Sequence, residues 1–163
     1  MNIRKANLKD SEKFLDMLKQ LDKEIKYMLF EPGERTATVE KIKDRINIDI
    51  FKQLTLIIDD GERIGGFLSA ERGYTKRIRH SAYVVIGLLK DYREQKLGTK
   101  LFEEMEKWAL ENNITRLELT VVESNEVGIK LYEKMGFKKE GLKERSMIVD
   151  GKYVNEYYMG KVL

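Results

Sequence analysis

The feature that most constrains the fold is a change of hydrophobic periodicity in the second half of the chain. An almost unbroken apolar run, AYVVIGLL at 82–89, precedes a helical pattern at 101–111. The strand-like run TRLELTVV at 115–122 and a second helical pattern at 125–137 follow. Parallel strands need a crossover of a dozen or more residues, usually a helix. The pattern therefore predicts a strand–helix–strand–helix unit with two neighbouring parallel strands.

Hairpins flank this unit on both sides. Before it, LTLIIDDGERIGGFLSAE at 54–71 predicts two strands joined by an Asp-Gly turn, and after it the tail predicts two strands joined at Asp150-Gly151. A short strand at 2–6 and two amphipathic helices come first. We therefore predict one α/β (α+β) domain over 1–163, with a mixed, mostly antiparallel sheet and helices on both faces.

The composition excludes several classes of protein. The 163 residues include no cysteine and one histidine, His80, so we expect no disulfide, no thiol nucleophile and no metal site. The net charge is +3 with both signs interleaved, which argues against a dedicated nucleic-acid binder. Neither an apolar signal core nor a run of 18 apolar residues is present. We expect a cytoplasmic protein without a membrane partner.

The segment KDYREQKLGTKL at 90–101 connects the first parallel strand to a helix. Backbone N–H groups in the first helical turn lack intrahelical acceptors, and the helix dipole adds positive charge there, so such a turn can bind phosphate. Gly98 would allow a close approach, and Arg93, Lys96 and Lys100 add charge. Taken alone, the segment favours a plain connection with solvated lysines, because one glycine is weak evidence.

Asn125 and Tyr132 lie seven residues apart in the second helical pattern. Seven residues are about two turns, so both lie along one face of the helix. A structural explanation exists for each residue, since Asn125 is a good N-cap and Tyr132 a good core aromatic.

Two short signatures occur in this part of the chain. YREQKLGTKLFEEMEKWA fits the pattern Arg/Gln-x-x-Gly-x-Gly/Ala, with Arg93, Lys96 and Gly98 at its positions. LELTVVESNEVGIKLYEKMGFKKEG fits Asn-x-x-Ala-x-x-x-Tyr-Glu-Lys-x-Gly-Phe; the matching residues are Asn125, Gly128, Tyr132, Glu133, Lys134, Gly136 and Phe137. In both signatures and their spacing, the chain from about His80 onward resembles the GNAT superfamily of acyl-CoA-dependent N-acetyltransferases.

The ends of the chain resemble the family to different degrees. The N-terminal third is similar in layout only, whereas the closing DGKYVNEYYMGKVL resembles a branch that acetylates ribosomal-protein termini, amino acids and polyamines. Two residues depart from the signatures. Lys96 stands at the first glycine of the pyrophosphate motif, and Gly128 replaces the usual alanine, at a cost of ~1 kcal/mol of helix stability.

The resemblance implies acetyl-CoA as the acyl donor, held in a V-shaped gap where the parallel strands 82–89 and 115–122 splay apart. It implies that backbone near Leu88 holds the thioester and pantetheine arm, and that the amides at 93–99 hold the pyrophosphate. The cofactor-binding residues implied are Leu88, Leu89, Arg93, Gln95, Lys96, Leu97, Gly98, Thr99 and Asn125. An amine would attack the thioester directly in a ternary complex, with Tyr132 as general acid.

The general base is less clear. Many relatives carry an acidic residue in the first splayed strand, where this chain has Tyr83. Glu118, in the second splayed strand, is the best replacement as a catalytic base, and a structural ion pair explains it equally well. A chain of waters is a further route for the proton. Glu34 and Tyr83 are candidates for contacting the acceptor, although Glu34 also fits a solvated loop charge.

Two other functions compete with acetyl transfer. The absent strand carboxylate and Lys96 fit a non-catalytic acyl-CoA-binding regulatory domain on the same fold. YTKRIRH at 74–80 is basic with one aromatic residue, as in some RNA-associated proteins, but it fits a solvated hairpin loop equally well. We expect no nucleic-acid partner. The acceptor is a small-molecule amine or a protein N-terminus, and a homodimer is compatible with the resemblance.

Overall fold

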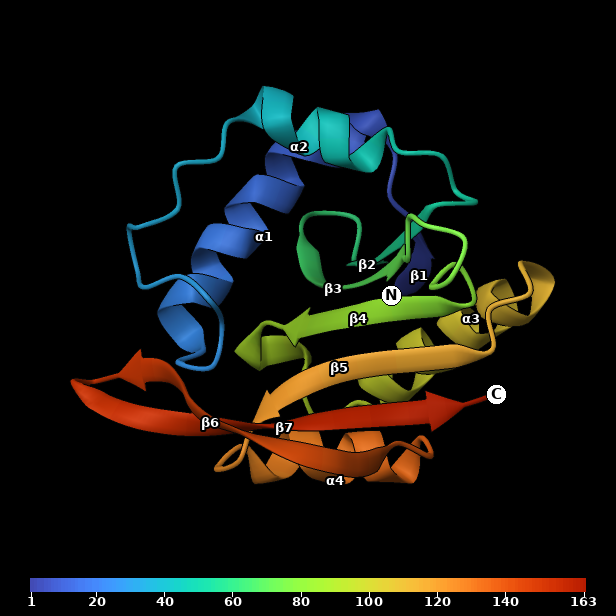
Figure 1. The fold of residues 1–163 in the computed structure, drawn as a ribbon. Coiled ribbons are helices and arrows are strands. Elements are labelled where there is room, and N and C mark those ends of the chain that lie inside the picture. Colours follow the sequence, from blue (N-terminus) through green and yellow to red (C-terminus); the bar gives the residue numbers. More distant parts are fainter.

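The computed structural model describes residues 1–163 and places seven strands in one sheet, in the order β1-β2-β3-β4-β5-β7-β6 (Figure 1). The strands are β1 Asn2–Lys5, β2 Gln53–Asp59, β3 Ile64–Arg72, β4 Ser81–Leu88, β5 Arg116–Val122, β6 Lys138–Val149 and β7 Lys152–Val162. The helices are α1 Ser11–Glu24, α2 Val39–Ile46, α3 Leu97–Glu111 and α4 Glu126–Lys134, with 3₁₀ turns η1 Leu8–Asp10 and η2 Lys90–Tyr92.

One pair of neighbouring strands is parallel. Strands β4 and β5 pair only at Ser81–Arg116, Ala82–Leu117 and Tyr83–Glu118, whereas all other neighbours are antiparallel. After Tyr83 and Glu118 the two strands have no further paired residues, although β4 remains paired with β3 and β5 with β7. The prediction of a mixed, mostly antiparallel sheet with two splayed parallel strands is therefore confirmed.

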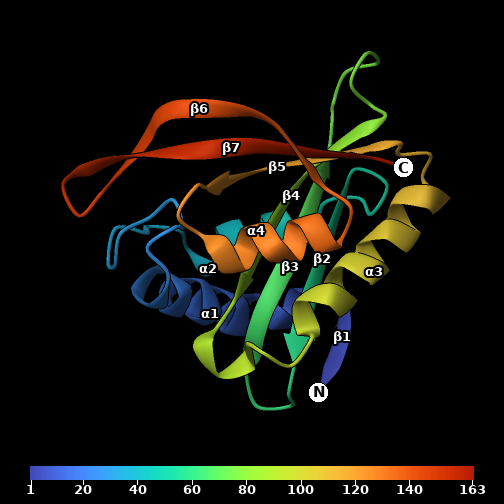
Figure 2. The same cartoon turned by 90° about the horizontal axis from the view of Figure 1, so that it is seen from below.

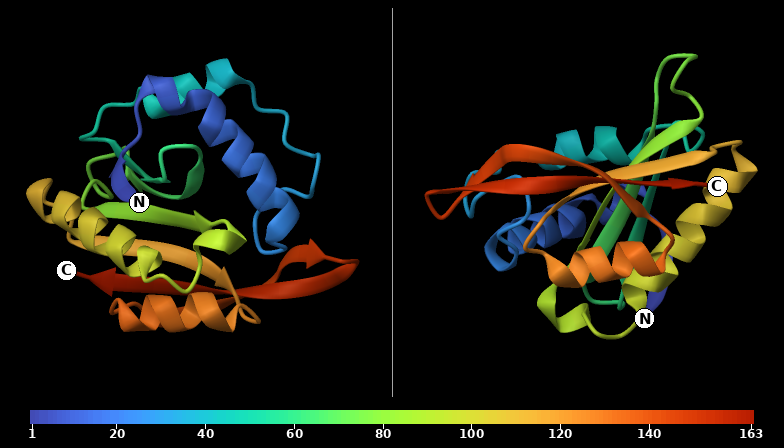
Figure 3. Two further views of the ribbon diagram at one scale, coloured as in Figure 1. Left: turned by 180° about the vertical axis from the view of Figure 1, so that it is seen from behind. Right: turned by 60° about the horizontal axis from the view of Figure 1, so that its bottom comes forward.

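Helices cover both faces of this sheet. Helix α1 packs on one face of β3, and α3, which carries the chain from β4 to β5, packs on the opposite face (Figures 2 and 3). Phe14 of α1 meets Phe67 of β3 edge-to-face at 5.5 Å between ring centroids. On the other face, Phe102, Tyr132 and Phe137 form a second aromatic cluster that joins α3 to α4.

Local signals set the ends of several elements. Thr38 caps α2 by accepting a hydrogen bond from the Lys41 amide at 3.3 Å. Asn7 starts the 3₁₀ turn that precedes α1, and Asp10, at the N-cap position of α1, accepts the Asn7 amide at 2.7 Å. Gly136, with φ of 91°, ends α4 in the left-handed conformation that the sequence predicts.

The C-terminal hairpin of β6 and β7 reaches past the ends of the other strands (Figure 2). Its turn at Asp150 and Gly151 has φ angles of 51° and 75°, as an Asp-Gly hairpin turn requires. Strand β6 is an exposed edge whose register shifts between Lys139 and Gly141. The segment 74–80 forms an exposed hairpin loop between β3 and β4. None of the helices is both long and apolar enough to cross a bilayer.

Candidate active site at the parting of two strands

The splayed strands direct unpaired backbone groups into the gap between them. Hydrogen bonds from the Leu89 amide to Gly65 and from the Gly73 amide to Ser81 show that the odd-numbered residues of β4 bond to β3. The even-numbered residues, including Ile86 and Leu88, therefore present their N–H and C=O groups toward β5, which has moved out of pairing range. One edge of the gap is thus a row of peptide groups without a strand partner, of which the Leu88 carbonyl accepts a hydrogen bond from the Arg93 side chain.

The opposite edge of the gap is built in the same way. The Glu123 amide donates to Asn155 and the Leu163 amide to Thr115, so the odd-numbered residues of β5 bond to β7. The backbone of Thr120 consequently points toward β4. An extended ligand with amide groups could therefore hydrogen-bond to either strand, as an added strand does.

The loop that follows β4 ends in a cluster of free amides. No protein group accepts a hydrogen bond from the backbone N–H groups of residues 94 to 99. Glu94 and Lys96 have φ angles of 61° and 60°, and α3 has neither a side-chain cap nor an acidic residue in its first turn. Left-handed residues before a helix N-terminus form an anion-binding concavity. The Lys134 ammonium lies beside it, 3.4 Å from the Thr99 hydroxyl.

Structural contacts hold this loop against the turn between β2 and β3. The Tyr92 ring is buried over Gly65, where any Cβ would lie 2.3 Å from it. The Tyr92 hydroxyl bonds to Asp60, and Arg63 pairs with Asp91 at 2.8 Å. These contacts with the β2–β3 turn fix the start of the loop. Neither signature includes the residues of that turn, so the signatures did not predict the contacts.

Two residues of the pyrophosphate motif play parts that the sequence did not show. A Cβ on Gly98 would lie 3.0 Å from Leu131 of α4, so this glycine allows α3 and α4 to approach each other. The expectation that Gly98 also makes room for a ligand stays a prediction. Lys96 adopts the left-handed conformation that glycine prefers, with its side chain exposed, which explains why a glycine is usual at this position.

Three other predicted cofactor residues have structural contacts of their own. Arg93 donates from Nε to the Leu88 carbonyl at 3.2 Å, and Gln95 donates to the Asp91 carbonyl at 2.9 Å. Both side chains brace the loop. Asn125 caps α4 by accepting the Gly128 amide at 3.1 Å. Leu89 and Leu97 have buried side chains. The Leu97 amide is free, whereas the Leu89 amide donates to Gly65 and the Leu89 carbonyl accepts from Tyr92.

Tyr132 lies where α4 meets the gap. Its side chain is buried in the aromatic cluster, but its hydroxyl makes no hydrogen bond to the protein. Because no unpartnered side-chain oxygen is fully enclosed, that hydroxyl must reach solvent. Burial, with a smaller contribution from the Tyr83 phenol, raises the pKa of Tyr132 to about 12. The structure thus presents a protonated phenol with a free hydrogen-bond donor.

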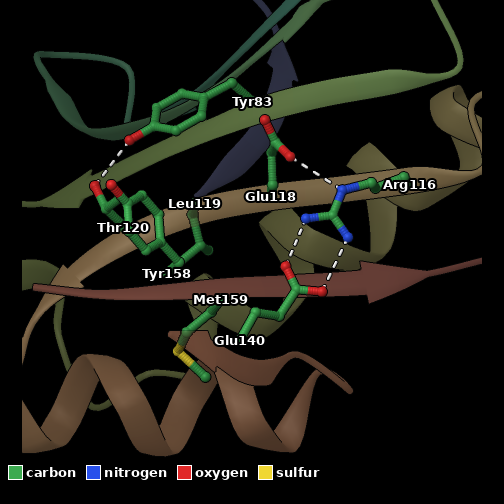
Figure 4. A pocket seen from close by; sticks show the side chains of 8 residues that line it. All are labelled: Tyr83, Arg116, Glu118, Leu119, Thr120, Glu140, Tyr158 and Met159. Atoms are coloured by element: carbon green, nitrogen blue, oxygen red, sulfur yellow. Dashed lines mark hydrogen bonds and ion pairs between the residues drawn. The ribbon is translucent and has the colours of Figure 1, made fainter. Parts of the chain in front are cut away.

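A hollow of about 410 Å³ opens between β4, β5 and the C-terminal hairpin (Figure 4). Its lining consists of Tyr83, Arg116, Glu118, Leu119, Thr120, Glu140, Tyr158 and Met159. The Tyr83 and Thr120 hydroxyls are 2.9 Å apart and join the strands by their side chains just beyond the last paired residues. Tyr132 itself does not line this hollow, although Tyr83, which does, contributes to the raised pKa of Tyr132.

Charged groups gather at one end of the hollow. Arg116 donates from Nε to Glu118 at 3.0 Å and holds Glu140 through both terminal nitrogens at 2.6 and 3.0 Å. The Glu118 side chain is 44% exposed, and only its Oε2 atom is engaged. Glu118 therefore forms the ion pair that was the structural alternative to a catalytic role. Its second carboxylate oxygen remains free.

The sequence did not identify all of the residues that line the hollow. Strand alternation could have grouped Arg116 and Thr120 with Glu118 on one face of β5. Glu140 had no such signal, because the register shift after Lys139 is what lets its carboxylate lie over Gly160 and reach Arg116. Glu34 is exposed between α1 and α2 and does not line the hollow. Its contact with an acceptor stays a prediction.

Comparison with known proteins gives a consistent result. The model of the Acetyltransferase (GNAT) family matches residues 15–137. The L-amino acid N-acetyltransferase AaaT of Escherichia coli (strain K12) is 32% identical over 127 residues, which cover 76% of this chain and 74% of that protein.

Solved structures are similar along nearly the whole chain. A GNAT-family acetyltransferase from Streptococcus pneumoniae superposes with a TM-score of 0.94 at 31% identity, covering 99% of both chains. The structure of yncA from Salmonella typhimurium with its cofactor acetyl-CoA has a TM-score of 0.88, covering 100% of this chain and 94% of its own. At 14% identity, the latter shows likeness of fold alone.

Proposed function

Since this chain belongs to the acetyltransferase (GNAT) family and is an acetyl-CoA-dependent N-acetyltransferase, we propose that a primary amine in the hollow attacks the acetyl group directly, in a ternary complex. The observation that carries this proposal is the meeting of three features at the parted strands: free peptide groups, a cluster of free amides and an unpartnered phenol. A binding domain would need the first two but not the third.

The residues around the gap fit acetyl-CoA. The amides of residues 94 to 99, with the Lys134 ammonium nearby, would hold the pyrophosphate without a metal ion. The backbone of Ile86 and Leu88 would pair with the amides of the pantetheine arm and orient the thioester. The side chain of Asn125 would act through its cap, which fixes the start of α4. Bound acetyl-CoA supplies an activated acyl group on a thiol leaving group.

Tyr132 would stabilise the departing sulfur. A phenol with a pKa of about 12 stays protonated at neutral pH, whereas an ordinary alkyl thiol has a pKa of about 8.5. Full transfer of the proton to the thiolate would therefore be unfavourable by several pKa units. We assign Tyr132 the role of a hydrogen-bond donor that acts where negative charge develops.

Glu118 is the group we assign to the amine proton. Its free carboxylate oxygen opens into the hollow, and its position is fixed through Arg116. The register pair of Tyr83 and Glu118 places the carboxylate beside the position where many family members carry an acidic residue. Tyr83 and Thr120, joined by their hydroxyls, would form the wall between the cofactor gap and the acceptor.

The test is an acetylation assay on a panel of amines, read by release of the free CoA thiol and by the mass of the product. The panel contains amino acids, amino-acid amides, short peptides and polyamines. We expect thiol release that requires an amine. Tight binding of CoA with no acetylation of any amine would instead support the non-catalytic binding domain, which the family membership does not favour.

A further inference from the structure

We propose that the acceptor is an α-amine whose neighbouring carboxyl group is already in an amide linkage, as at the N-terminus of a peptide, rather than a free amino acid. This inference rests on the proposed function, because it takes the hollow between β4, β5 and the C-terminal hairpin as the acceptor site. It concerns the charge of that hollow, which the similarity to an L-amino acid N-acetyltransferase does not determine.

The charged lining of the hollow is negative overall. Arg116 contributes one positive charge, and Glu118 and Glu140 contribute two negative charges. No other charged side chain lines the hollow. An ammonium group is attracted to such a surface, whereas a free carboxylate one bond from the reacting amine carbon would lie among like charges.

Arg116 has no free pair of guanidinium nitrogens with which to bind the carboxylate of an acceptor. A guanidinium binds a carboxylate bidentately either through its two terminal nitrogens or through Nε and one terminal nitrogen. Glu140 occupies both terminal nitrogens, and Glu118 occupies Nε. The arginine in the hollow is therefore already committed to the protein's own carboxylates, as Figure 4 shows.

The uncharged part of the lining suits an amide. Tyr83, Thr120 and Tyr158 bring three hydroxyls to the end of the hollow away from Arg116. A hydroxyl can donate to an amide carbonyl, and the free Glu118 oxygen or a hydroxyl can accept from an amide N–H. A peptide bond next to the reacting amine would thus find partners of both kinds without adding charge.

The acid–base chemistry of the site points the same way. The α-amine of a peptide has a pKa of about 8, so roughly a fifth to a third of it is neutral near pH 7.4, against roughly 0.1% of a lysine-type amine with a pKa of about 10.4. Glu118, which shares Arg116 with Glu140, would then need to deprotonate a smaller fraction of the amine than it would for a lysine-type acceptor. The absence of an acidic residue at Tyr83 is compatible with such an acceptor.

Matched acceptors test this inference. For alanine, serine, methionine and phenylalanine, we would compare the free amino acid, its amide and a dipeptide with the same first residue, using CoA release and product mass. Rates are compared per neutral amine between pH 7 and pH 10, because the free amino acid has the more basic amine. We expect kcat/KM for the amides and dipeptides to exceed that for the free acids by at least about tenfold.

Charge variants connect the preference to the hollow. Glu140→Gln removes one carboxylate and leaves Arg116 with a free fork, so the ratio of amide to free acid should fall by at least about threefold. Glu144→Gln removes the same charge from the same strand outside the hollow and should leave the ratio unchanged. Melting temperatures of both variants confirm that they fold.

Three results would overturn the inference. The first is a free acid that is used as well as its amide per neutral amine, which would place the carboxylate on other cations such as Lys19 and Lys23 of α1. The second is an equal fall of the ratio in Glu144→Gln and Glu140→Gln. The third is acetylation of polyamines alone. A protein that releases no thiol with any amine would instead contradict the proposed function.

Discussion

The two sides of the gap between β4 and β5 are built from different groups. On the side that we propose for the cofactor, the free groups are the backbone amides of residues 94 to 99, the peptide groups of Ile86 and the Leu88 amide. On the acceptor side, the exposed groups are side chains, which include one arginine, two carboxylates and three hydroxyls. Every residue carries a peptide group, but only particular residues carry a guanidinium or a carboxylate.

This difference explains how far each side tolerates substitution. Lys96 can stand in place of a glycine because the amide is still there, at the cost of a left-handed backbone. On the acceptor side, a single change of residue alters the charge or the hydrogen-bond inventory of the hollow. We expect cofactor binding to depend weakly on most side chains, and acceptor choice to depend strongly on a few.

The largest expected effect is at Tyr132, between the two sides. Tyr132→Phe keeps the ring in its aromatic cluster and removes the donor, so kcat should fall by about 10²–10³-fold with CoA affinity unchanged. Because burial raises the pKa of this phenol to about 12, it stays protonated as pH rises, and the wild-type rate should show no alkaline loss from it below about pH 11. Single-turnover rates across pH measure both. A wild-type rate in Tyr132→Phe would mean that water donates the hydrogen bond to the departing sulfur.

The next effect concerns the carboxylate of the acceptor side. Glu118→Gln should lower kcat/KM by about 10–100-fold at pH 6.5, where most of the amine is protonated. Part of the loss should return above the pKa of the amine, where a base is no longer needed. A pH–rate profile parallel to the wild type, in a protein that melts earlier, would assign Glu118 a structural role with Arg116 only.

A smaller effect separates backbone from side chain on the cofactor side. Lys96→Glu places a carboxylate at the N-terminus of α3 and should raise the Kd for CoA by about five- to tenfold. Lys96→Gly keeps the amides and relieves the left-handed conformation, so the free energy of unfolding should rise by ~0.5–1 kcal/mol with less than a twofold change in Kd. Calorimetric titration and urea denaturation check the pair. Equal losses of CoA affinity in the two variants would mean that binding depends on the Lys96 ammonium and not on the backbone amides.

The smallest effect is expected where the two sides meet. Tyr83→Phe removes the hydrogen bond to Thr120, and the KM for the amine should rise about threefold while the Kd for CoA does not change. Tyr158→Phe removes a hydroxyl from the same hollow without breaking a hydrogen bond within the protein, so it separates the loss of a contact with the acceptor from the loss of the bond between Tyr83 and Thr120. If CoA affinity falls in Tyr83→Phe, the pair of hydroxyls belongs to the cofactor side.

The fold was largely predictable because its signals are local and repeated. The periodicity at 82–137 predicted the parallel pair, and Gly136 and Asp150-Gly151 marked turns that require a positive φ. The motif predicted which loop would hold the cofactor, but it did not predict the packing of Gly98, because that depends on Leu131 in another helix. A spacing pattern records that a residue is needed, and the packing shows what needs it.

The acceptor side was less predictable, for a physical reason. Glu118 was identified as a carboxylate in a strand, but its partners Arg116 and Glu140 come together only through the pairing of β5 with β7 and β7 with β6. A register shift in β6 sets the direction of the Glu140 side chain, and no residue pattern in the sequence predicts that shift. Side-chain constellations that cross several strands require the register of each pair.

The three residue pairs between β4 and β5 have a consequence for how the molecule unfolds. They are the only strand pairing between β1–β4 and β5–β7, so the sheet is divided into two blocks with a weak seam. Amides at the seam, such as those of Ile86 and Thr120, should exchange with solvent deuterium faster than their neighbours in the same strands. A bound acyl-CoA would fill the seam and slow them. The ligand would then connect β4 and β5 where the two strands are unpaired, and it would raise the cooperativity of unfolding.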